Sequence, residues 1–260
     1  MNETVRGDVA AWREGWIGVV ELRRPPHNFF DNALIAAIAE SLEAFDADPA
    51  CRVVILQAQG KNFCAGADFT NRPTTGLIEE PGRKHLYQEA VRLFRSRKPL
   101  IAQVQGAAVG GGLGLALVAD FRVAAPEARF SANFARLGFH PGFGLSVTLP
   151  RVIGPQKAAL MFYTGQRVTG EEAHAWGLAD LLAPLPELAA ATRRFAEEIA
   201  QSAPLAVLSI RETLRRGLAE QVEAATEREL VEQEWQRRTA DFAEGVRASA
   251  ERRLPRFEGR

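Results

Sequence analysis

Two glycine-containing segments decide the interpretation of this sequence: GKNFCAGAD at residues 60–68 and GAAVGGGLG at residues 106–114. Each follows a short apolar segment and ends where a helix can begin. A glycine in a helical first turn costs about 1 kcal/mol relative to alanine. The four glycines between residues 110 and 114 therefore indicate that something approaches the backbone closely. The unpaired N–H groups of a helix N-terminus suit a phosphate or a developing oxyanion.

Close packing of a helix explains one such loop equally well, whereas two loops favour a ligand site. Nucleotide-binding motifs do not fit these glycines. The pattern Gly110-x-Gly112-x-x-Leu115 lacks the third glycine of a dinucleotide fingerprint, and no acidic residue ends a strand about 20 residues later. A P-loop needs Gly-Lys followed by Ser or Thr, which is absent from the sequence.

The segments that flank the loops alternate between strand-like and helix-like patterns. Pro25 and Pro26 end a first strand, and Asp31 is placed to cap a helix whose apolar residues recur at helical spacing from Leu34 to Phe45. The strand candidates are residues 16–22, 52–57, 100–104 and 121–124. Strands that alternate with helices predict an α/β fold.

The pattern becomes helical in the last third of the chain. Residues 169–172 read TGEE, which is the signature of a capping box at a helix start. Helix-forming residues dominate from Pro186 onward. We therefore expect an α/β core over residues 1–185 and a helical region over residues 186–260.

The composition excludes several classes of protein. The chain has 260 residues, 47% of them hydrophobic, which is enough to bury a core without disulfide or metal staples. Its 32 basic residues balance 32 acidic ones, which disfavours nucleic-acid binding. Cys51 and Cys64 lack the spacing of a metal site, so we expect no metal. Neither a secretory signal nor a bilayer-spanning run is present, so we expect a cytoplasmic protein that does not bind membranes.

Four segments together carry a resemblance to a known family. Residues 60–69 (GKNFCAGADF), 104–131, 136–158 and 239–260 resemble the enoyl-CoA hydratase/isomerase (crotonase) superfamily in order, spacing and length. The resemblance implies a spiral of ββα units with a helical C-terminal trimerisation region, assembled as a homotrimer or a dimer of trimers. It also implies an acyl-CoA substrate, with coenzyme A as part of that substrate and no permanently bound cofactor.

The resemblance also assigns binding residues. The backbone N–H groups of Ala67 and Gly111 would form the oxyanion hole for the thioester carbonyl, whose charge grows as an enolate develops. Ala65, Gly66, Asp68 and Phe69 fall in the stretch that lines the coenzyme A pocket in the family. Asp68 fits a helix N-cap equally well.

The sequence departs from the family where a hydratase carries two glutamates. Those positions are occupied here by Gly114 and Phe134. General acid–base groups contribute about 10²–10⁴-fold to rates, so we expect hydration to be severely depressed unless another group substitutes. His140, whose imidazole can titrate near neutrality, is our first candidate, although a structural loop histidine has the same signature. His85 is a second candidate.

Other polar residues have both functional and simple interpretations. Asn133 and Arg136 flank Phe134 and could hold water or a substrate carboxylate, or lie at the surface. Arginines outnumber acids in the tail, which fits either a coenzyme A phosphate or a solvated helix face. The tail arginines are Arg247, Arg252, Arg253, Arg256 and Arg260.

Three functions follow from these observations. The first is an enzyme that hydrates or isomerises an enoyl-CoA through an enolate held in the oxyanion hole. The second is an acyl-CoA-binding protein with weak or absent turnover, because both glutamates are replaced. The third is a hydrolase with the same fold that acts on a substrate without coenzyme A.

Overall fold

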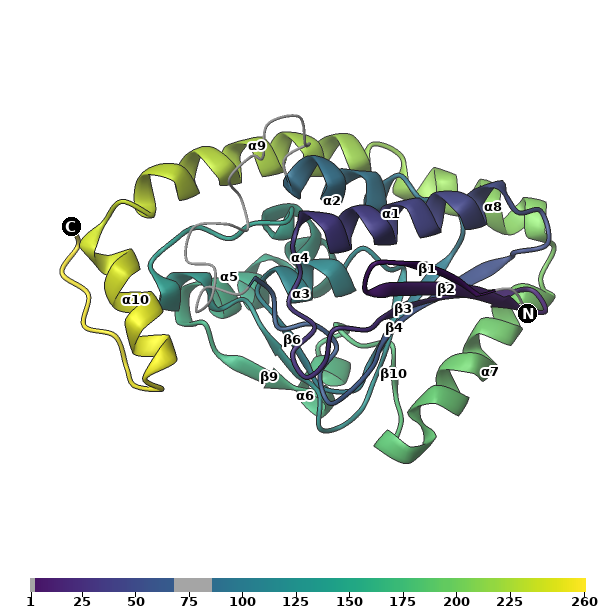
Figure 1. Ribbon diagram of the computed structural model, residues 1–260, viewed down its shortest axis with the longest axis horizontal. Coiled ribbons are helices and arrows are strands. Elements are labelled where there is room, and N and C mark those ends of the chain that lie inside the picture. The colour runs from purple at the N-terminus through teal and green to yellow at the C-terminus, as the bar shows by residue number, and fades with distance from the viewer. Residues whose placement is uncertain (1–2, 68–85) are drawn as a thin grey trace.

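A mixed sheet forms the centre of the fold in the computed structural model, which describes residues 3–67 and 86–260 (Figure 1). Within this part of the chain the sheet has seven strands in the order β1-β2-β3-β4-β5-β7-β10. The first three are antiparallel: β1 (Thr4–Arg6), β2 (Val9–Glu14) and β3 (Ile17–Leu22). The others run parallel: β4 (Val53–Ala58), β5 (Leu100–Val104), β7 (Phe121–Ala124) and β10 (Leu181–Leu182).

Helices cover both faces of this main sheet, and the strand β4 shows why. Val54 and Leu56 pack in the core that contains helix α1 (Asn32–Ala47), whereas Val53 and Ile55 pack against helix α7 (Leu188–Gln201). In Figure 1, α1 and α7 lie on opposite sides of the strands. A strand buried on both faces is apolar at successive positions, which is the pattern of this segment.

Local sequence signals account for most of these elements. The strands predicted at residues 16–22, 52–57, 100–104 and 121–124 correspond to β3, β4, β5 and β7. Asp31 caps α1, since its side chain accepts a hydrogen bond from the Leu34 N–H at 2.9 Å. The capping box at Thr169 is also confirmed. Strands β1, β2 and β10 of this sheet were not predicted; β1 is an edge strand without an apolar run, and β10 has two residues.

A second, smaller sheet carries the glycine-rich loop. In the described residues it has three strands in the order β6-β8-β9, namely β6 (Ala107–Val109), β8 (Arg129–Ser131) and β9 (Arg167–Thr169). Strand β6 leads directly into helix α3 (Gly111–Ala116). The remaining elements between β8 and α7 are η1 (Asn133–Leu137), α4 (Leu145–Ile153), α5 (Pro155–Thr164), α6 (Gly170–Ala175) and η2 (Leu185–Glu187).

The C-terminal part is helical, as predicted, and no strand follows β10 in the part of the chain that the structure describes. It consists of α7, α8 (Pro204–Arg215), α9 (Leu218–Gln236) and α10 (Ala240–Ala250). Figure 1 shows α9 along one side of the molecule, above α2 (Leu86–Phe94), with α10 at its far end. None of the helices in residues 3–67 and 86–260 combines the length and apolar character needed to cross a bilayer.

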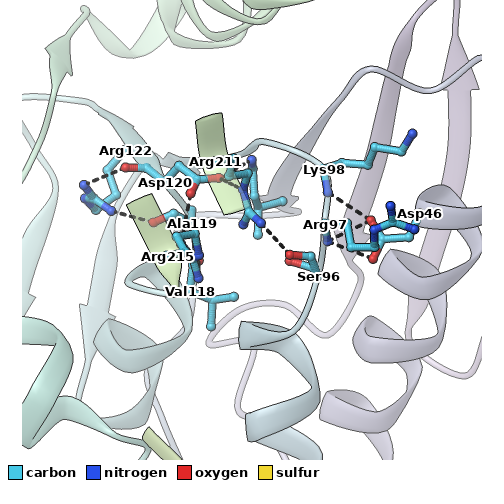
Figure 2. Close-up of polar contacts among 11 residues, drawn as sticks. Asp46, Ser96, Arg97, Lys98, Val118, Ala119, Asp120, Arg122, Arg211 and Arg215 are labelled. Atoms are coloured by element: carbon cyan, nitrogen blue, oxygen red, sulfur yellow. Dashed lines mark hydrogen bonds and ion pairs between the residues drawn. The ribbon is translucent and has the colours of Figure 1, made fainter. Parts of the chain in front are cut away.

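An ion-pair cluster fastens α8 to the core (Figure 2). The Asp120 carboxylate accepts hydrogen bonds from Arg211 Nε at 2.8 Å and from Arg215 Nη1 at 2.9 Å. It also accepts from the Leu100 N–H at 2.8 Å. Burial lowers the pKa of the Arg215 guanidinium, and the charge of Asp120 opposes that effect. Asp120 is therefore a structural residue that holds two cations.

Neutralising Asp120 is expected to destabilise the fold. The Asp120→Asn variant leaves Arg211 and Arg215 buried without a counter-charge, which should lower the free energy of unfolding by about 3 kcal/mol. The matched control is Glu234→Gln, whose pair with Arg238 is exposed, and its effect should stay within about 0.5 kcal/mol. Urea denaturation of both variants measures the difference. If both variants lower the free energy of unfolding by the same small amount, the cluster does not secure α8.

Candidate functional site

The two glycine-containing loops predicted from sequence meet in space. The Cys64 N–H donates to the Ala107 carbonyl at 2.9 Å, and the Val109 N–H donates to the Cys64 carbonyl at 3.0 Å. A Cβ atom at Gly112 would lie 2.0 Å from the Cys64 oxygen, so only glycine fits at this crossing. The glycines thus allow one backbone to pack directly against the other.

This crossing brings the backbones of Ala67 and Gly111 together. A Cβ atom built on Gly66 would lie 3.6 Å from the Gly111 nitrogen. Gly111 is the first residue of α3, so its N–H has no acceptor within the helix. The Gly66 carbonyl accepts from the Phe30 N–H at 3.0 Å, and the N–H of Ala67 has no hydrogen-bond acceptor among the described residues. The Gly66–Ala67 segment and the start of α3 therefore lie close together.

Both residues line one cavity of about 300 Å³. Its wall also includes Ala65, Gly66 and Asn133, and no acidic residue lines it among the described residues. Tyr87, Arg167 and Arg237 are the ionisable side chains found there in the same described part. The apolar wall is formed by Phe29, Phe30, Leu86, Phe134, Leu137, Phe139, Phe143 and Val246. Two amide donors in a mostly apolar cavity suit a carbonyl group that gains negative charge.

Comparison with known proteins identifies the family. The family model for enoyl-CoA hydratase/isomerase matches residues 13–260. The chain belongs to this family. A putative enoyl-CoA hydratase of Thermus thermophilus is 34% identical over 94% of this chain and 98% of its own. The 1,2-epoxyphenylacetyl-CoA isomerase of Escherichia coli is 31% identical over 95% of this chain and 97% of its own.

Solved structures agree with the family assignment. The crystal structure of an enoyl-CoA hydratase/isomerase from Pseudoalteromonas atlantica has a TM-score of 0.87 at 29% identity, and covers 96% of this chain and 100% of its own. An enoyl-CoA hydratase from Mycobacterium avium subsp. paratuberculosis has a TM-score of 0.84 at 26% identity, covering 97% of this chain and 99% of its own. The predicted superfamily and the crotonase-like fold class are confirmed.

The first position where we expect a glutamate in this family's hydratases is filled by a neighbouring ring. A Cβ atom at Gly114 would lie 2.8 Å from Cδ1 and 2.9 Å from Cβ of Phe143. Phe143 is 1% exposed and adopts a φ of 64°, a left-handed conformation that is costly for a bulky residue. The structure therefore has no room for a side chain at residue 114.

The second glutamate position is also apolar. Phe134 lies in η1, is 6% exposed and packs edge-on against Phe139, with ring centroids 5.3 Å apart. Phe139 in turn packs against Phe242 of α10. The two positions together make this side of the cavity a packed aromatic cluster.

Of the candidate substitutes, His140 lies away from this cavity. It lines a second cavity together with Trp235 and Gln236, and its Nδ1 lies 2.8 Å from the Pro141 carbonyl oxygen. His140 itself is absent from the wall of the first cavity, although Phe139 and Phe143 of the same loop line it. His85, Asp68 and Phe69 lie outside the described residues.

Asn133 and Arg136, the two polar residues that flank Phe134, lie in different environments. Asn133 lines the cavity. Arg136 donates from Nε to the Thr164 carbonyl at 2.8 Å, on the exposed surface.

In the tail, Arg253 and Arg247 pair with Glu244 of α10. That the tail arginines bind a phosphate of coenzyme A stays a prediction.

Tyr87 and Arg237 line the cavity but had no signal in the sequence. The Tyr87 hydroxyl donates to Gln233 Oε1 at 2.9 Å, and Gln233 Nε2 donates to the His140 carbonyl at 2.9 Å. Burial raises the pKa of Tyr87, so its hydroxyl stays protonated and acts as a donor. These contacts join α2, α9 and the loop before α4, which no local pattern could have connected.

The ionisation of Tyr87 can be measured directly, because the chain has two tyrosines. In a Tyr163→Phe variant the ultraviolet absorbance of tyrosinate reports Tyr87 alone. Because burial penalises the phenolate, we expect no tyrosinate as the pH passes the ordinary tyrosine pKa of about 10. A Tyr87→Phe variant supplies the reference curve for Tyr163. A midpoint for Tyr87 at or below its ordinary value would show that burial does not raise its pKa.

Proposed function

We propose that the chain binds an acyl-CoA thioester and stabilises its enolate with the backbone N–H groups of Ala67 and Gly111. The observation that supports this proposal is the crossing of the two loops, because Ala67 of one loop and Gly111 of the other line the same cavity. The thioester oxygen gains negative charge as a proton leaves the adjacent carbon. Fixed donors therefore stabilise the enolate more than the starting thioester, which lowers the barrier.

Within this chemistry, isomerisation of an enoyl-CoA fits the cavity better than hydration. Hydration requires a water molecule held and deprotonated by polar groups, whereas Gly114 and Phe134 leave this region apolar. Tyr87 retains its proton, so it can donate a hydrogen bond or a proton but does not act as a base. A shift of a double bond needs no bound water, but a base must take the proton from one carbon and return it to the other. We assign this role to His85, the acid–base candidate that lies outside the described residues.

A second candidate is an acyl-CoA-binding protein with weak or absent turnover. It is favoured by one specific observation, namely that no carboxylate or imidazole lines the cavity among residues 3–67 and 86–260. The fold and the oxyanion hole would then serve binding alone.

One experiment separates these functions. Calorimetric titration with coenzyme A and a panel of enoyl-CoA esters measures binding, and product analysis of the same samples measures turnover. The proposed function predicts binding together with isomerised product. Binding without product would support the binding protein, and the absence of any binding would favour the hydrolase that acts without coenzyme A.

We also propose that the protein works as a homotrimer or a dimer of trimers. Helix α8 supports an interface, because Leu205, Ile210 and Leu214 are 80%, 59% and 67% exposed. Apolar side chains gathered on one helix are typical of a covered surface. Sedimentation velocity measures the assembly, and a monomer at micromolar concentration would contradict it.

A further inference from the structure

Arg237 is a cation in the apolar part of the cavity wall. It directly follows α9, and its guanidinium carbon lies 5.6 Å from the ring centroid of Phe139. It lines the same cavity as Ala67 and Gly111. A charged group in such surroundings is costly unless a partner compensates it.

The described residues offer Arg237 an incomplete set of partners. Nη2 donates to Gln233 Oε1 at 2.9 Å, whereas the buried Nε has no hydrogen-bond partner in that part of the chain. No acidic residue of the described ranges forms an ion pair with Arg237. The adjacent Arg238 differs, because it pairs with Glu234 at 2.8 Å on the surface.

Two arginines that are buried elsewhere in the fold have different partners from the partly buried Arg237. Arg122 and Arg211 each have a carboxylate within 3.0 Å, from Asp180 and Asp120. Arg237 has instead Tyr87, a group that burial keeps neutral. The dipole at the C-terminal end of α9 favours a cation there, but it provides no acceptor for Nε. An anion is the partner that this site lacks.

We propose that the acyl group of the bound thioester carries a second carboxylate, remote from the thioester, and that Arg237 binds it. The substrate class is thus the mono-CoA thioesters of dicarboxylic acids. A guanidinium matches a carboxylate through two parallel hydrogen bonds, and this pairing is stronger in a site shielded from water. Arg237 is a specificity-determining residue in this proposal, which rests on the proposed function.

The test compares matched thioesters on wild-type protein and two variants. Calorimetry measures Kd for succinyl-, glutaryl- and adipyl-CoA, for the monocarboxylic butyryl-, valeryl- and hexanoyl-CoA, and for coenzyme A alone. The variants are Arg237→Met and, as the control, Arg238→Met, which removes the neighbouring surface cation. Because a hydrogen bond to a charged group is strong, we expect at least one dicarboxylic thioester to bind about 10- to 100-fold tighter than its monocarboxylic partner.

Arg237→Met should abolish this preference, and Arg238→Met should leave it unchanged. Arg237→Met should also unfold at the same or a higher urea concentration, because it removes an uncompensated charge. Equal binding of both thioester series, or a preference that survives in Arg237→Met, would overturn the inference while leaving the proposed function intact. Uniform weakening of every ligand, including coenzyme A, would mean that Arg237 binds a phosphate and would also overturn it. If no thioester binds, the proposed function falls and this inference with it.

Discussion

Removing the Gly111 N–H is expected to lower kcat by about 10²–10³-fold, the usual effect of losing one oxyanion-hole donor. Proline at this position removes the N–H and suits the first residue of a helix. A Cβ atom at residue 111 would lie 2.3 Å from Cζ of Phe30, so both test proteins carry Phe30→Leu to make space. One protein then has Gly111→Pro and the other Gly111→Ala.

The alanine protein is a close control, since the two differ mainly in the N–H group. The rate of enoyl-CoA isomerisation, measured at saturating substrate, should fall only in the proline protein. Urea denaturation of both proteins checks that the fold is retained. Equal rates in the two proteins would exclude the Gly111 N–H from the reaction.

The second large effect concerns the space at residue 114. Gly114→Glu places a side chain against Phe143 and buries a carboxylate without a partner, which should lower the free energy of unfolding by about 5 kcal/mol. Phe143→Gly loses an aromatic side chain at a cost of about 3–5 kcal/mol, reduced because glycine accepts the φ of 64°. The double variant should lose less free energy of unfolding than the two single variants lose together, because the ring no longer obstructs the new side chain.

A double-mutant cycle by urea denaturation measures this coupling. Phe121→Ala serves as the control partner, because Phe121 packs on the other face of the main sheet with Phe195. Its effect should simply add to that of Gly114→Glu. Additive effects for Phe143→Gly as well would show that the ring does not fill the space at residue 114.

The sequence predicted the backbone of the site because its signals are local. The glycine runs at residues 60–68 and 106–114 indicate close approach of backbones, and the crossing at Gly112 shows that approach. Asp31 and Thr169 cap the helices that they were predicted to cap, since a cap depends on residues within one turn. Strand β4 was recognised because it is buried on both faces.

The side chains that line the cavity could not be predicted in the same way. Phe143 fills the space beside Gly114 across a gap of about thirty residues, and no local rule connects the two. Tyr87 and Arg237 meet at Gln233 because α2 packs on α9. Phe139 and Phe143 line the cavity, but His140 between them lines a second cavity, and its N–H donates to Gln236 of α9. Each of these outcomes depends on tertiary packing.

The most direct test of the oxyanion hole is the infrared stretching frequency of an isotope-labelled thioester carbonyl in bound acyl-CoA. Hydrogen bonds from Ala67 and Gly111 polarise the carbonyl, so binding should lower the frequency relative to the free thioester. The shift should be present in the Gly111→Ala protein with Phe30→Leu and reduced in its Gly111→Pro counterpart. A bound thioester whose frequency matches that in solution, or an equal shift in both proteins, would contradict the account.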